Sequence, residues 1–533
     1  MIPERLSRLR REMEQRHIDV YVVPTADFHE SEYVGAHFKA RSYITGFTGS
    51  AGTAIITMTE AGLWTDARYF LQAKHQLENT GVTLYRMGEE SVPTIMEYLR
   101  SALPEGGTLG FDGRVINARL GAEFLALAGE KNAKLAVGED LVGIIWDDRP
   151  ELPHAPVRIL TAEYSGRSTA DKLADVRAEM EKQGASVHLL TSLYDIAWLL
   201  NVRGGDIDYV PVVLSYLALT EEQCLWFVQD AVLTDELRAY LAENRIETRP
   251  YESFYDYAAA IPAGETVLLD KGVCNYRLVS EFCEGVEIVD ETNPSVLMKS
   301  IKNETEQKNT VNAHIKDGVA VTKFIYWLKK NIGKTPMTEL SASDYLAARR
   351  AEQKGFLALS FDTICAYGAH AAIIHYAPTP ETDIPLEAHG LLLVDSGGHY
   401  LEGTTDITRT IALGPVTDAE RADFTRVLRS HLHLANARFL HGCTGLNLDI
   451  LAREPLWEAD LDYKHGTGPV SYTHLTLPTS DHDRRAGPLH RGRLRYPHRE
   501  RASLPKGCQK RVRAVHVLPK SHLRADRPRR DRC

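Results

Sequence analysis

The sequence lacks the features of a secreted or membrane-bound protein. Its 533 residues include seven cysteines, an odd number with no Cys-x-x-Cys pair, which argues against a disulfide framework and against a zinc ribbon. No apolar run approaches the roughly 20 residues that span a bilayer. The start, MIPERLSRLRREMEQ, is charged and amphipathic, which is not the pattern of a signal peptide. We therefore expect a cytoplasmic protein with no membrane partner.

A recognisable nucleotide-binding loop is also lacking. Gly46, Gly49 and Gly52 lie in one glycine-rich stretch, but their spacing matches neither the dinucleotide fingerprint nor the Walker motif. Tight turns are the better interpretation of these glycines.

What the sequence does contain is a weak internal repeat. The stretch Arg10–Glu14 (RREME) recurs as Arg177–Glu181 (RAEME), each time ahead of an apolar strand. This echo predicts two copies of one α/β domain, and the chain length suits two to four domains. Linkers are expected at Asp147–Pro153 and near Asn293, which gives predicted domains at residues 1–150, 155–293 and 296–468.

A long amphipathic helix is predicted at the start of the third domain. Apolar residues recur at helical spacing across Asn303–Lys330. One side of this helix carries Val311, Ile315, Val319, Thr322 and Ile325.

The candidate chemistry centres on Leu391–Thr410. A short apolar strand leads into Asp395, a Ser-Gly-Gly turn follows, and a threonine-rich strand carries Asp406. Period-2 alternation puts Asp406 on one face with threonines rather than with core aliphatic residues. If the two strands lie side by side, the carboxylates converge, and a divalent cation would relieve their repulsion. Otherwise Asp395 would cap a strand end and Asp406 would face water.

Two histidines flank this stretch. His375 is expected at the end of an apolar strand, ahead of Tyr-Ala-Pro, and His465 precedes a Gly-Thr-Gly turn. Each could be a hydrogen-bonded structural residue. Two His and two Asp within about ninety positions are better evidence of a hydrolytic metal centre than either histidine motif alone.

These motifs resemble those of the aminopeptidase P family, the Xaa-Pro aminopeptidases with a creatinase-type, pita-bread catalytic domain. The resemblance rests on TGFTGSAGTA at 45–54, LWTDARYFLQA at 63–73, DIAWLLNVRG at 195–204, NAHIKDGVAV at 312–321, AIIHYAP at 372–378, VDSGGHYLEGTTDITRT at 394–410 and HGTG at 465–468. It covers residues 1–468 and is similar to the three-domain, cytosolic form of the family. It implies an α/β (α+β) chain with two creatinase-type N-terminal domains ahead of a pita-bread domain.

The resemblance also implies a site. Asp395 would chelate one of two divalent metal ions, usually manganese, and Asp406 would bridge both, with a hydroxide between them as the nucleophile. His375 and His465 would orient the scissile amide, stabilise developing charge or transfer a proton. The implied reaction releases the N-terminal residue from peptides whose second residue is proline. A homodimer is expected, and a nucleic-acid partner is not.

The resemblance stops at Gly468. In the family a metal-binding His follows HGTG and two glutamates come later, whereas here Pro469 follows and Glu500 is the single glutamate beyond it. Three of five expected ligands therefore have no counterpart, so we expect a truncated pita-bread domain and impaired activity of this chain. The alternative functions are a peptide-binding pita-bread module without catalysis and a prolidase-like dipeptidase.

Residues 469–533 differ in composition from the rest of the chain. They hold 17 Lys and Arg against 5 Asp and Glu, whereas residues 1–468 hold 45 basic and 67 acidic residues. A basic nucleic-acid arm and a divergent natural C-terminus are two interpretations. A frameshift or chimeric junction is favoured, because VSYTHLTLPT at 470–479 looks like translated sequencing-adapter sequence. The Arg, Pro and His bias that follows is typical of a GC-rich gene read out of frame.

Overall fold

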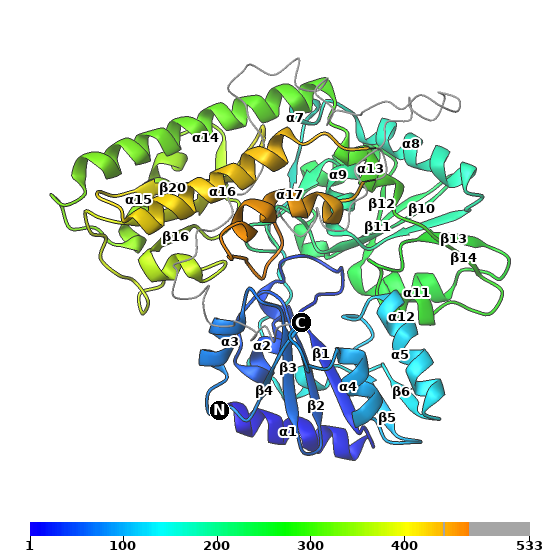
Figure 1. Ribbon diagram of the computed structural model, residues 1–533. Coiled ribbons are helices and arrows are strands. Elements are labelled where there is room, and N and C mark those ends of the chain that lie inside the picture. Colours follow the sequence, from blue (N-terminus) through cyan, green and yellow to red (C-terminus); the bar gives the residue numbers. More distant parts are fainter. Residues whose placement is uncertain (441–442, 468–533) are drawn as a thin grey trace. The chain divides into compact units, whose positions relative to one another are not determined.

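The computed structural model describes residues 1–440 and 443–467, and the helices and strands follow the chain as shown in Figure 1. The chain divides into two compact units, a first unit of residues 1–305 and a second unit that starts at residue 306. Within the described ranges, no helix is both long enough and apolar enough to cross a membrane. The predicted basic tail at 469–533 lies outside the described residues.

The first unit contains two six-stranded mixed sheets with the same topology. The strand order is β4-β3-β2-β1-β5-β6 in one sheet and β12-β11-β10-β8-β13-β14 in the other. The first sheet comprises β1 (Val20–Pro24), β2 (Thr53–Thr57), β3 (Ala61–Thr65), β4 (Thr83–Arg86), β5 (Thr108–Phe111) and β6 (Lys134–Ala136). The second comprises β8 (Val187–Leu190), β10 (Ser215–Thr220), β11 (Cys224–Val228), β12 (Glu247–Pro250), β13 (Thr266–Leu269) and β14 (Glu287–Asp290). In both sheets the corresponding neighbours are parallel or antiparallel alike, so the predicted repeat is confirmed.

Helices lie between the strands of both repeats. The first repeat contains α1 (Ile2–Gln15), α2 (Ala40–Thr45), α3 (Phe70–Gln76), α4 (Ile95–Ala102), α5 (Ala118–Glu130) and α6 (Leu141–Ile145). The second contains α7 (Ala162–Ser165), α8 (Thr169–Lys182), α9 (Leu193–Leu199), α10 (Asp235–Glu243), α11 (Phe254–Ala259), α12 (Tyr276–Ser280) and α13 (Pro294–Ser300). Consecutive residues of one strand pack into different buried clusters, for example Tyr21 and Val22 of β1. Each sheet is therefore packed on both faces, as in other α/β domains with parallel strands.

The sequence echo corresponds to one hydrogen bond that occurs twice. Arg10 Nε donates to the carbonyl of Thr57, the last residue of β2, at 2.9 Å. Arg177 Nε donates to the carbonyl of Thr220, the last residue of β10, at 2.8 Å. Each arginine therefore links the first long helix of its repeat to the end of the equivalent strand.

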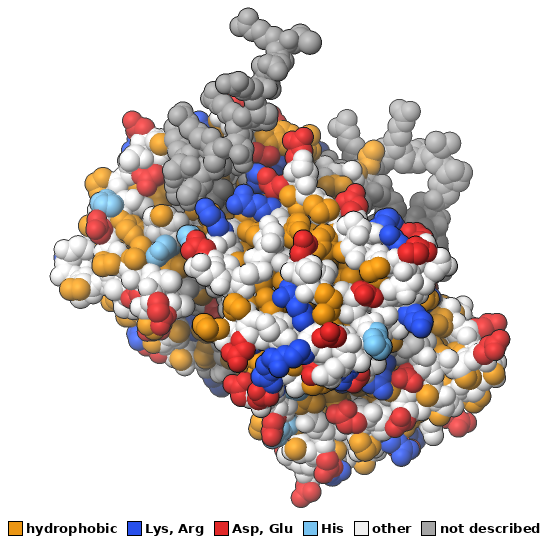
Figure 2. Space-filling model, turned by 90° about the horizontal axis from the view of Figure 1, so that it is seen from below, with side chains coloured by type: hydrophobic (Ala, Val, Ile, Leu, Met, Phe, Trp, Pro, Cys, Tyr) orange, Lys and Arg blue, Asp and Glu red, His pale blue; other side chains and the backbone are white. Residues whose placement is uncertain are grey.

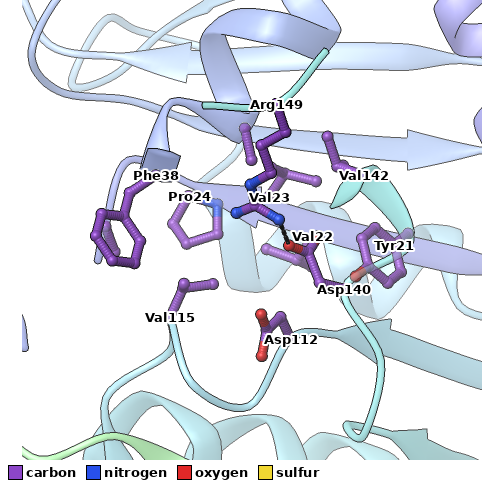
Figure 3. Close-up of a pocket in the computed structure, with 12 residues that line it drawn as sticks. Tyr21, Val22, Val23, Pro24, Phe38, Asp112, Val115, Asp140, Val142 and Arg149 are labelled. Carbon is purple, nitrogen blue, oxygen red and sulfur yellow. Dashed lines mark hydrogen bonds and ion pairs between the residues drawn. The ribbon is translucent and has the colours of Figure 1, made fainter. Parts of the chain in front are cut away.

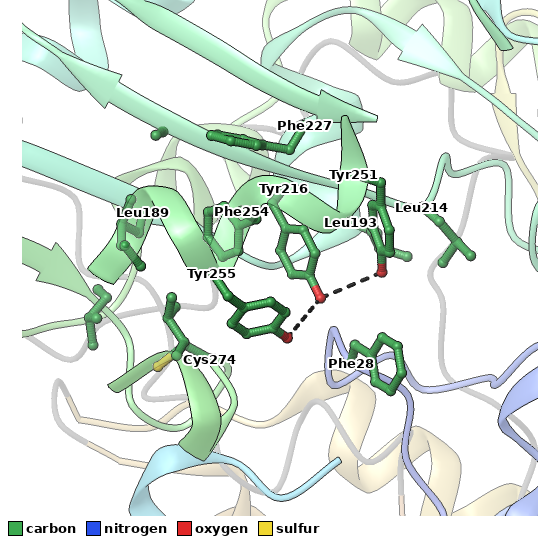
Figure 4. Packing of buried hydrophobic residues seen from close by; sticks show 14 of the residues in the cluster. Phe28, Leu189, Leu193, Leu214, Tyr216, Phe227, Tyr251, Phe254, Tyr255 and Cys274 are labelled. Atoms are coloured by element: carbon green, nitrogen blue, oxygen red, sulfur yellow. Dashed lines mark hydrogen bonds between the residues drawn. The ribbon is translucent and has the colours of Figure 1, made fainter. Parts of the chain in front are cut away.

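The two repeats meet through equivalent segments. The backbone N–H of Ala118 donates to the carbonyl of Cys274 at 2.8 Å, and that of Tyr276 donates to the carbonyl of Ile116 at 2.7 Å. This exchange is reciprocal, as expected across a local two-fold relation between α5 and α12. Figure 4 shows Phe28 of the first repeat near Tyr216 of the second, in one shared apolar cluster.

The second unit contains two three-stranded sheets in its described part, β15-β18-β19 and β16-β17-β20. Its strands are β15 (Phe356–Leu359), β16 (Ile364–Tyr367), β17 (Leu391–Ser396), β18 (Gly398–Tyr400), β19 (Gly403–Thr404) and β20 (Ile407–Ala412). Its helices are α14 (Glu304–Asn331), α15 (Glu339–Ala351), α16 (Asp418–Asn436) and α17 (Gly445–Trp457). Phe324 of α14 and Leu346 of α15 belong to one apolar cluster with Val394 of β17, so these two helices cover one face of the second sheet.

The predicted helix at Asn303–Lys330 is present as α14, but its apolar side is not the buried one. Ile315 and Val319 are 56% and 44% exposed. The buried residues are Ala313, Asp317, Ala320, Val321, Phe324 and Leu328. Asp317 can be buried because the Nε atom of Arg350 lies 2.6 Å from its Oδ1 atom, and both side chains are fully buried. The pair with Arg350 of α15 allows Asp317 to lie on the side of α14 that buries Phe324 and Leu328.

Candidate functional site

Asp395 and Asp406 lie on one antiparallel ribbon. β17 pairs with β20 so that Asp395 lies opposite Thr408, and the pairing of β18 with β19 continues the same register. Extending that register places Asp406 opposite Gly397. Asp395 and Asp406 are then diagonal neighbours on one face, a separation of about 7–8 Å that side chains can bridge.

Gly397 lets the two segments of the ribbon approach each other. A Cβ atom at this position would collide with the carbonyl oxygen of Thr405 and with the hydroxyl of Ser360. The Ser360 hydroxyl donates to the Thr405 carbonyl at 2.9 Å, and the N–H of Gly398 donates to the Thr405 hydroxyl at 3.0 Å. The Ser-Gly-Gly turn therefore sets the spacing between the carboxylates rather than carrying chemistry itself.

The surroundings of Asp395 are apolar on one side and hydroxylic on the other. Its side chain is 2% exposed, and its Oδ1 atom accepts a hydrogen bond from the Thr408 hydroxyl at 2.7 Å. Leu393 on the same strand face packs with Ile364 and Tyr376. Asp406 is half-buried and lies in the gap between β19 and β20, so the threonine-rich strand predicted to carry it is interrupted at this residue. Because Asp395 is almost fully buried, the charge of its carboxylate needs compensation.

Two carboxylates on one face are a partial donor set for a hard cation such as Mn²⁺. In residues 1–440 and 443–467, no three or more His, Cys, Asp or Glu side chains are grouped so as to hold a metal ion. The role of Asp395 and Asp406 as metal ligands therefore stays a prediction. The expectation that three of five ligands have no counterpart concerns residues beyond 468, which lie outside the described part of the chain.

His375 does not end a strand, so that part of the sequence prediction is wrong. It lies in a turn after a short 3-10 helix at Gly368–Ala372, is exposed, and has a φ of 61°. The next residue, Tyr376, is buried against the sheet face that carries Asp395. The apolar residues before His375 pack within this turn and do not form a strand.

The loop that carries His465 is held by α17. Arg453 of α17 donates to the carbonyl of Tyr463 at 2.6 Å and to the carbonyl of His465 at 2.9 Å. The His465 ring stacks on Tyr463 with centroids 4.7 Å apart, and its Nδ1 atom lies 2.8 Å from the Gly466 carbonyl. Burial raises the pKa of Tyr463. These contacts anchor the HGTG loop as far as residue 467.

Sequence reasoning missed one buried carboxylate close to these residues, Glu339. It is the first residue of α15, fully buried, and it accepts hydrogen bonds from Tyr367, His370 and Tyr376. In the sequence it looks like an ordinary acidic residue in a first helical turn. Only the fold shows that its partners surround the turn at His375.

A small pocket in the first repeat is a second candidate for a functional site. It is lined by residues of β1 and by three charged side chains, Asp112, Asp140 and Arg149 (Figure 3). Arg149 pairs with Asp140 at 2.5 Å, and Arg114 pairs with Asp112 at 2.9 Å. Because both carboxylates already have arginine partners, the charged residues of this pocket are explained as structural ion pairs.

Three family models match the chain. Residues 5–140 and 148–306 each match a Creatinase/Prolidase N-terminal domain, and residues 308–476 match the metallopeptidase family M24. These ranges lie close to the predicted domains, whose bounds stay a prediction.

Named relatives align over most of the chain. It is 39% identical over 480 residues to a probable Xaa-Pro aminopeptidase P of Neurospora crassa, covering 87% of this chain and 70% of the relative. It is 37% identical over 503 residues to aminopeptidase P2 of Arabidopsis thaliana, covering 88% and 71%.

A solved structure has the same fold. The X-prolyl aminopeptidase of Caenorhabditis elegans, described as a cytosolic enzyme with a di-nuclear active site, superposes with a TM-score of 0.83 at 31% identity. The match covers 88% of this chain and 79% of that one. The chain therefore belongs to the aminopeptidase P (Xaa-Pro aminopeptidase) family of enzymes, with creatinase-type N-terminal domains and an M24 metallopeptidase domain of pita-bread fold.

Proposed function

We propose that the gene product from which this chain derives is a metal-dependent aminopeptidase that releases the N-terminal residue from peptides with proline in the second position. The observation that carries the proposal is the shared register of the ribbon, which puts Asp395 and Asp406 on one face. Membership of the aminopeptidase P family supplies the reaction, because its named relatives are Xaa-Pro aminopeptidases. A pocket shaped to the proline ring could select such peptides, since proline lacks an N–H and has a fixed φ.

Asp395 and Asp406 are the proposed ligands of two divalent metal ions, with Mn²⁺ as the proposed metal. The described donor set fits this assignment in part, and the di-nuclear site named for the Caenorhabditis elegans enzyme supports it. When bound, such ions would activate water and polarise the scissile carbonyl. His375 and His465 are the proposed substrate-facing residues, which orient the amide and hold or pass a proton to the proline nitrogen.

The setting of the enzyme is proposed on the same basis. We propose a cytoplasmic homodimer with domains at 1–150, 155–293 and 296–468, and with no nucleic-acid partner. The cytosolic description of the Caenorhabditis elegans enzyme and the free cysteines among the described residues support the compartment. Sedimentation of the purified chain tests the dimer.

The first experiment compares this chain with the product of the gene read in frame beyond codon 468. Both proteins are incubated with Mn²⁺ and an Arg-Pro-Pro peptide, and release of arginine is measured. We expect release by the in-frame protein and at least a hundredfold less by this chain. Full activity of the 533-residue chain would contradict the predicted impairment. Resequencing across codon 468 tests the origin of the tail, and a clean read that reproduces it would contradict the junction.

Binding without catalysis is the second candidate for this particular chain. The lack of a counterpart in the sequence for three of the five expected ligands favours it. Metal analysis after dialysis distinguishes the two functions, because about two equivalents of manganese per chain would exclude the binding-only alternative. Cleavage of Xaa-Pro dipeptides but not of longer peptides by the in-frame protein would instead indicate a prolidase-like dipeptidase.

A further inference from the structure

Glu339 collects hydrogen bonds from both ends of one short segment. Its Oε1 atom accepts from the backbone N–H of Tyr367 at 2.6 Å. Its Oε2 atom accepts from His370 Nδ1 at 2.9 Å and from the Tyr376 hydroxyl at 2.8 Å. These partners span residues 367–376, the segment that contains His375.

The electrostatics of this cluster make the carboxylate hard to replace. A fully buried carboxylate is strongly disfavoured unless it is hydrogen-bonded and its charge is compensated. His370 is the partner that can carry a positive charge, and the N-terminus of α15 adds a favourable dipole. Because a carboxylate can only accept hydrogen bonds, His370 must carry its proton on Nδ1. Burial raises the pKa of Tyr376 well above its usual range, which keeps its hydroxyl available as a donor.

The conformation of His375 depends on these contacts. Its φ of 61° lies in the left-handed region, which non-glycine residues adopt uncommonly, histidine more often than most. On one side, Tyr376 packs against Ile364 and Leu393, on the face that carries Asp395. The Tyr376 hydroxyl is fixed by Glu339. The turn is thus held at the sheet and at the start of α15.

We propose that Glu339 is a positioning residue, which acts through His370 and Tyr376 to hold His375 in its substrate-facing orientation. The substrate-facing role of His375 rests on the proposed function, whereas the positioning of its turn does not. Glu339 itself contacts neither the two carboxylates nor the imidazole of His375 through any bond described above. It acts on the backbone that carries that imidazole.

The test follows the His375 imidazole in the 533-residue chain by NMR, with His375→Gln used to assign its signal. Glu339→Gln keeps the shape but removes the charge and part of the acceptor capacity. We expect the His375 signal to move and the Tyr376 amide to exchange with solvent at least tenfold faster. Asp195→Asn is the matched control, because Asp195 is a buried carboxylate of the first unit that pairs with Lys299 at 2.6 Å. It should leave both readouts unchanged.

Three further variants keep the proposal falsifiable if Glu339→Gln does not fold. Tyr376→Phe removes a single hydrogen bond and should move the His375 signal in the same direction. His370→Asn retains a side-chain N–H donor and should preserve the wild-type signal, whereas His370→Ala should not. An unchanged His375 signal in both Glu339→Gln and Tyr376→Phe would overturn the positioning proposal.

Activity of the in-frame protein separates this proposal from the proposed function. With Glu339→Gln we expect a roughly tenfold lower kcat and a nearly unchanged KM, because the substrate pocket is intact while the histidine is misplaced. A moved His375 signal in a protein that cleaves no Xaa-Pro peptide would contradict the function and leave the positioning role standing.

Discussion

The central strands of the first unit and helix α16 of the second unit differ in how completely their apolar residues are buried. In the first unit, alternate residues of the central strands β1 and β8 pack into clusters on both faces of their sheets. In the second unit, α16 turns Phe424, Leu428 and Leu432 outward, with 39%, 46% and 47% of each side chain exposed. The residues that α16 buries are Asp423, Val427 and Ser430.

Exposure alone does not make this stripe unusual. Hydrophobic side chains are scattered among charged ones on the face shown in Figure 2, as on most soluble proteins. What is unusual is the helical spacing of the three residues, which forms a continuous stripe along α16. Ile315 and Val319 on α14 repeat the pattern in the same unit. A pattern of apolar residues therefore predicts a helix but not whether its apolar side is covered.

The largest expected effect is the loss of a core residue from the first unit. Trp226 of β11 is fully buried, so Trp226→Ala should lower the free energy of unfolding by about 3–5 kcal/mol. The control is Leu432→Ala on α16, which should lower it by less than about 1 kcal/mol. Urea unfolding followed by circular dichroism measures both. Equal losses would show that the α16 stripe is covered in solution.

Acid should destabilise the first unit through His188. This side chain is fully buried, its Nδ1 atom lies 2.9 Å from the Leu268 carbonyl, and burial lowers its pKa to about 4. The unfolded chain, with a pKa near 6.5, binds the proton more tightly, so stability is intact above pH 6.5 and falls as the pH drops towards 4. The expected slope is about 1.4 kcal/mol per pH unit. His188→Gln should remove it in unfolding measurements between pH 7 and pH 4.5.

His29 should add to the same acid sensitivity at the junction of the repeats. Its Nδ1 atom lies 2.9 Å from the Thr191 carbonyl, which can only accept, so Nδ1 carries the proton. The Tyr251 hydroxyl, 2.8 Å from Nε2, must then donate to it. Burial lowers the pKa of His29, although the nearby Asp27 opposes this effect. The measurement adds His29→Gln to the His188→Gln protein and compares how steeply the free energy of unfolding falls with pH. If the two slopes are equal, His29 does not contribute.

Local patterns in the sequence located several elements correctly. The apolar run before Asp395 is β17, the helix expected at Asn303–Lys330 is α14, and the Arg10–Glu14 echo marks a true repeat. These features depend on residues that are neighbours in sequence or on motifs that recur. The assignment of Asp395 and Asp406 as metal ligands, and of His375 and His465 as substrate-facing residues, stays a prediction that the ribbon register supports only for the carboxylates.

Features that depend on distant partners could not be predicted. Asp317 is buried because Arg350, 33 positions away, pairs with it. Glu339 is buried because His370 and Tyr376, 31 and 37 positions away, donate to it. The turn at His375 has a strand-like sequence but is shaped by those contacts. Periodicity reports which side chains are apolar and carries no information about which polar groups meet.

A smaller effect tests whether the two repeats are energetically alike. Arg10→Ala removes the guanidinium bond to the Thr57 carbonyl at the end of β2. Arg177→Ala removes the equivalent bond to Thr220 and a longer, exposed bond of 3.2 Å to the Gln223 carbonyl. Each should lower the free energy of unfolding by about 1–2 kcal/mol, and the two values should agree within about 0.5 kcal/mol. Chemical denaturation of both variants and of the double variant measures this. Markedly unequal losses would show that the shared topology does not imply shared stability.

The smallest expected effect compares one helix cap in each unit. Thr94 of α4 and Thr417 of α16 each form a capping box with a glutamate three residues later. Thr94→Ala and Thr417→Ala should each remove about 1 kcal/mol of local stability, because the cap bonds do not depend on the packing of the rest of the helix. Hydrogen exchange of the first-turn amides measures this. If α16 exchanges freely even with Thr417 in place, the uncovered stripe leaves the helix frayed. Equal protection of α4 and α16 would instead show that caps and the Val427 side suffice to hold it.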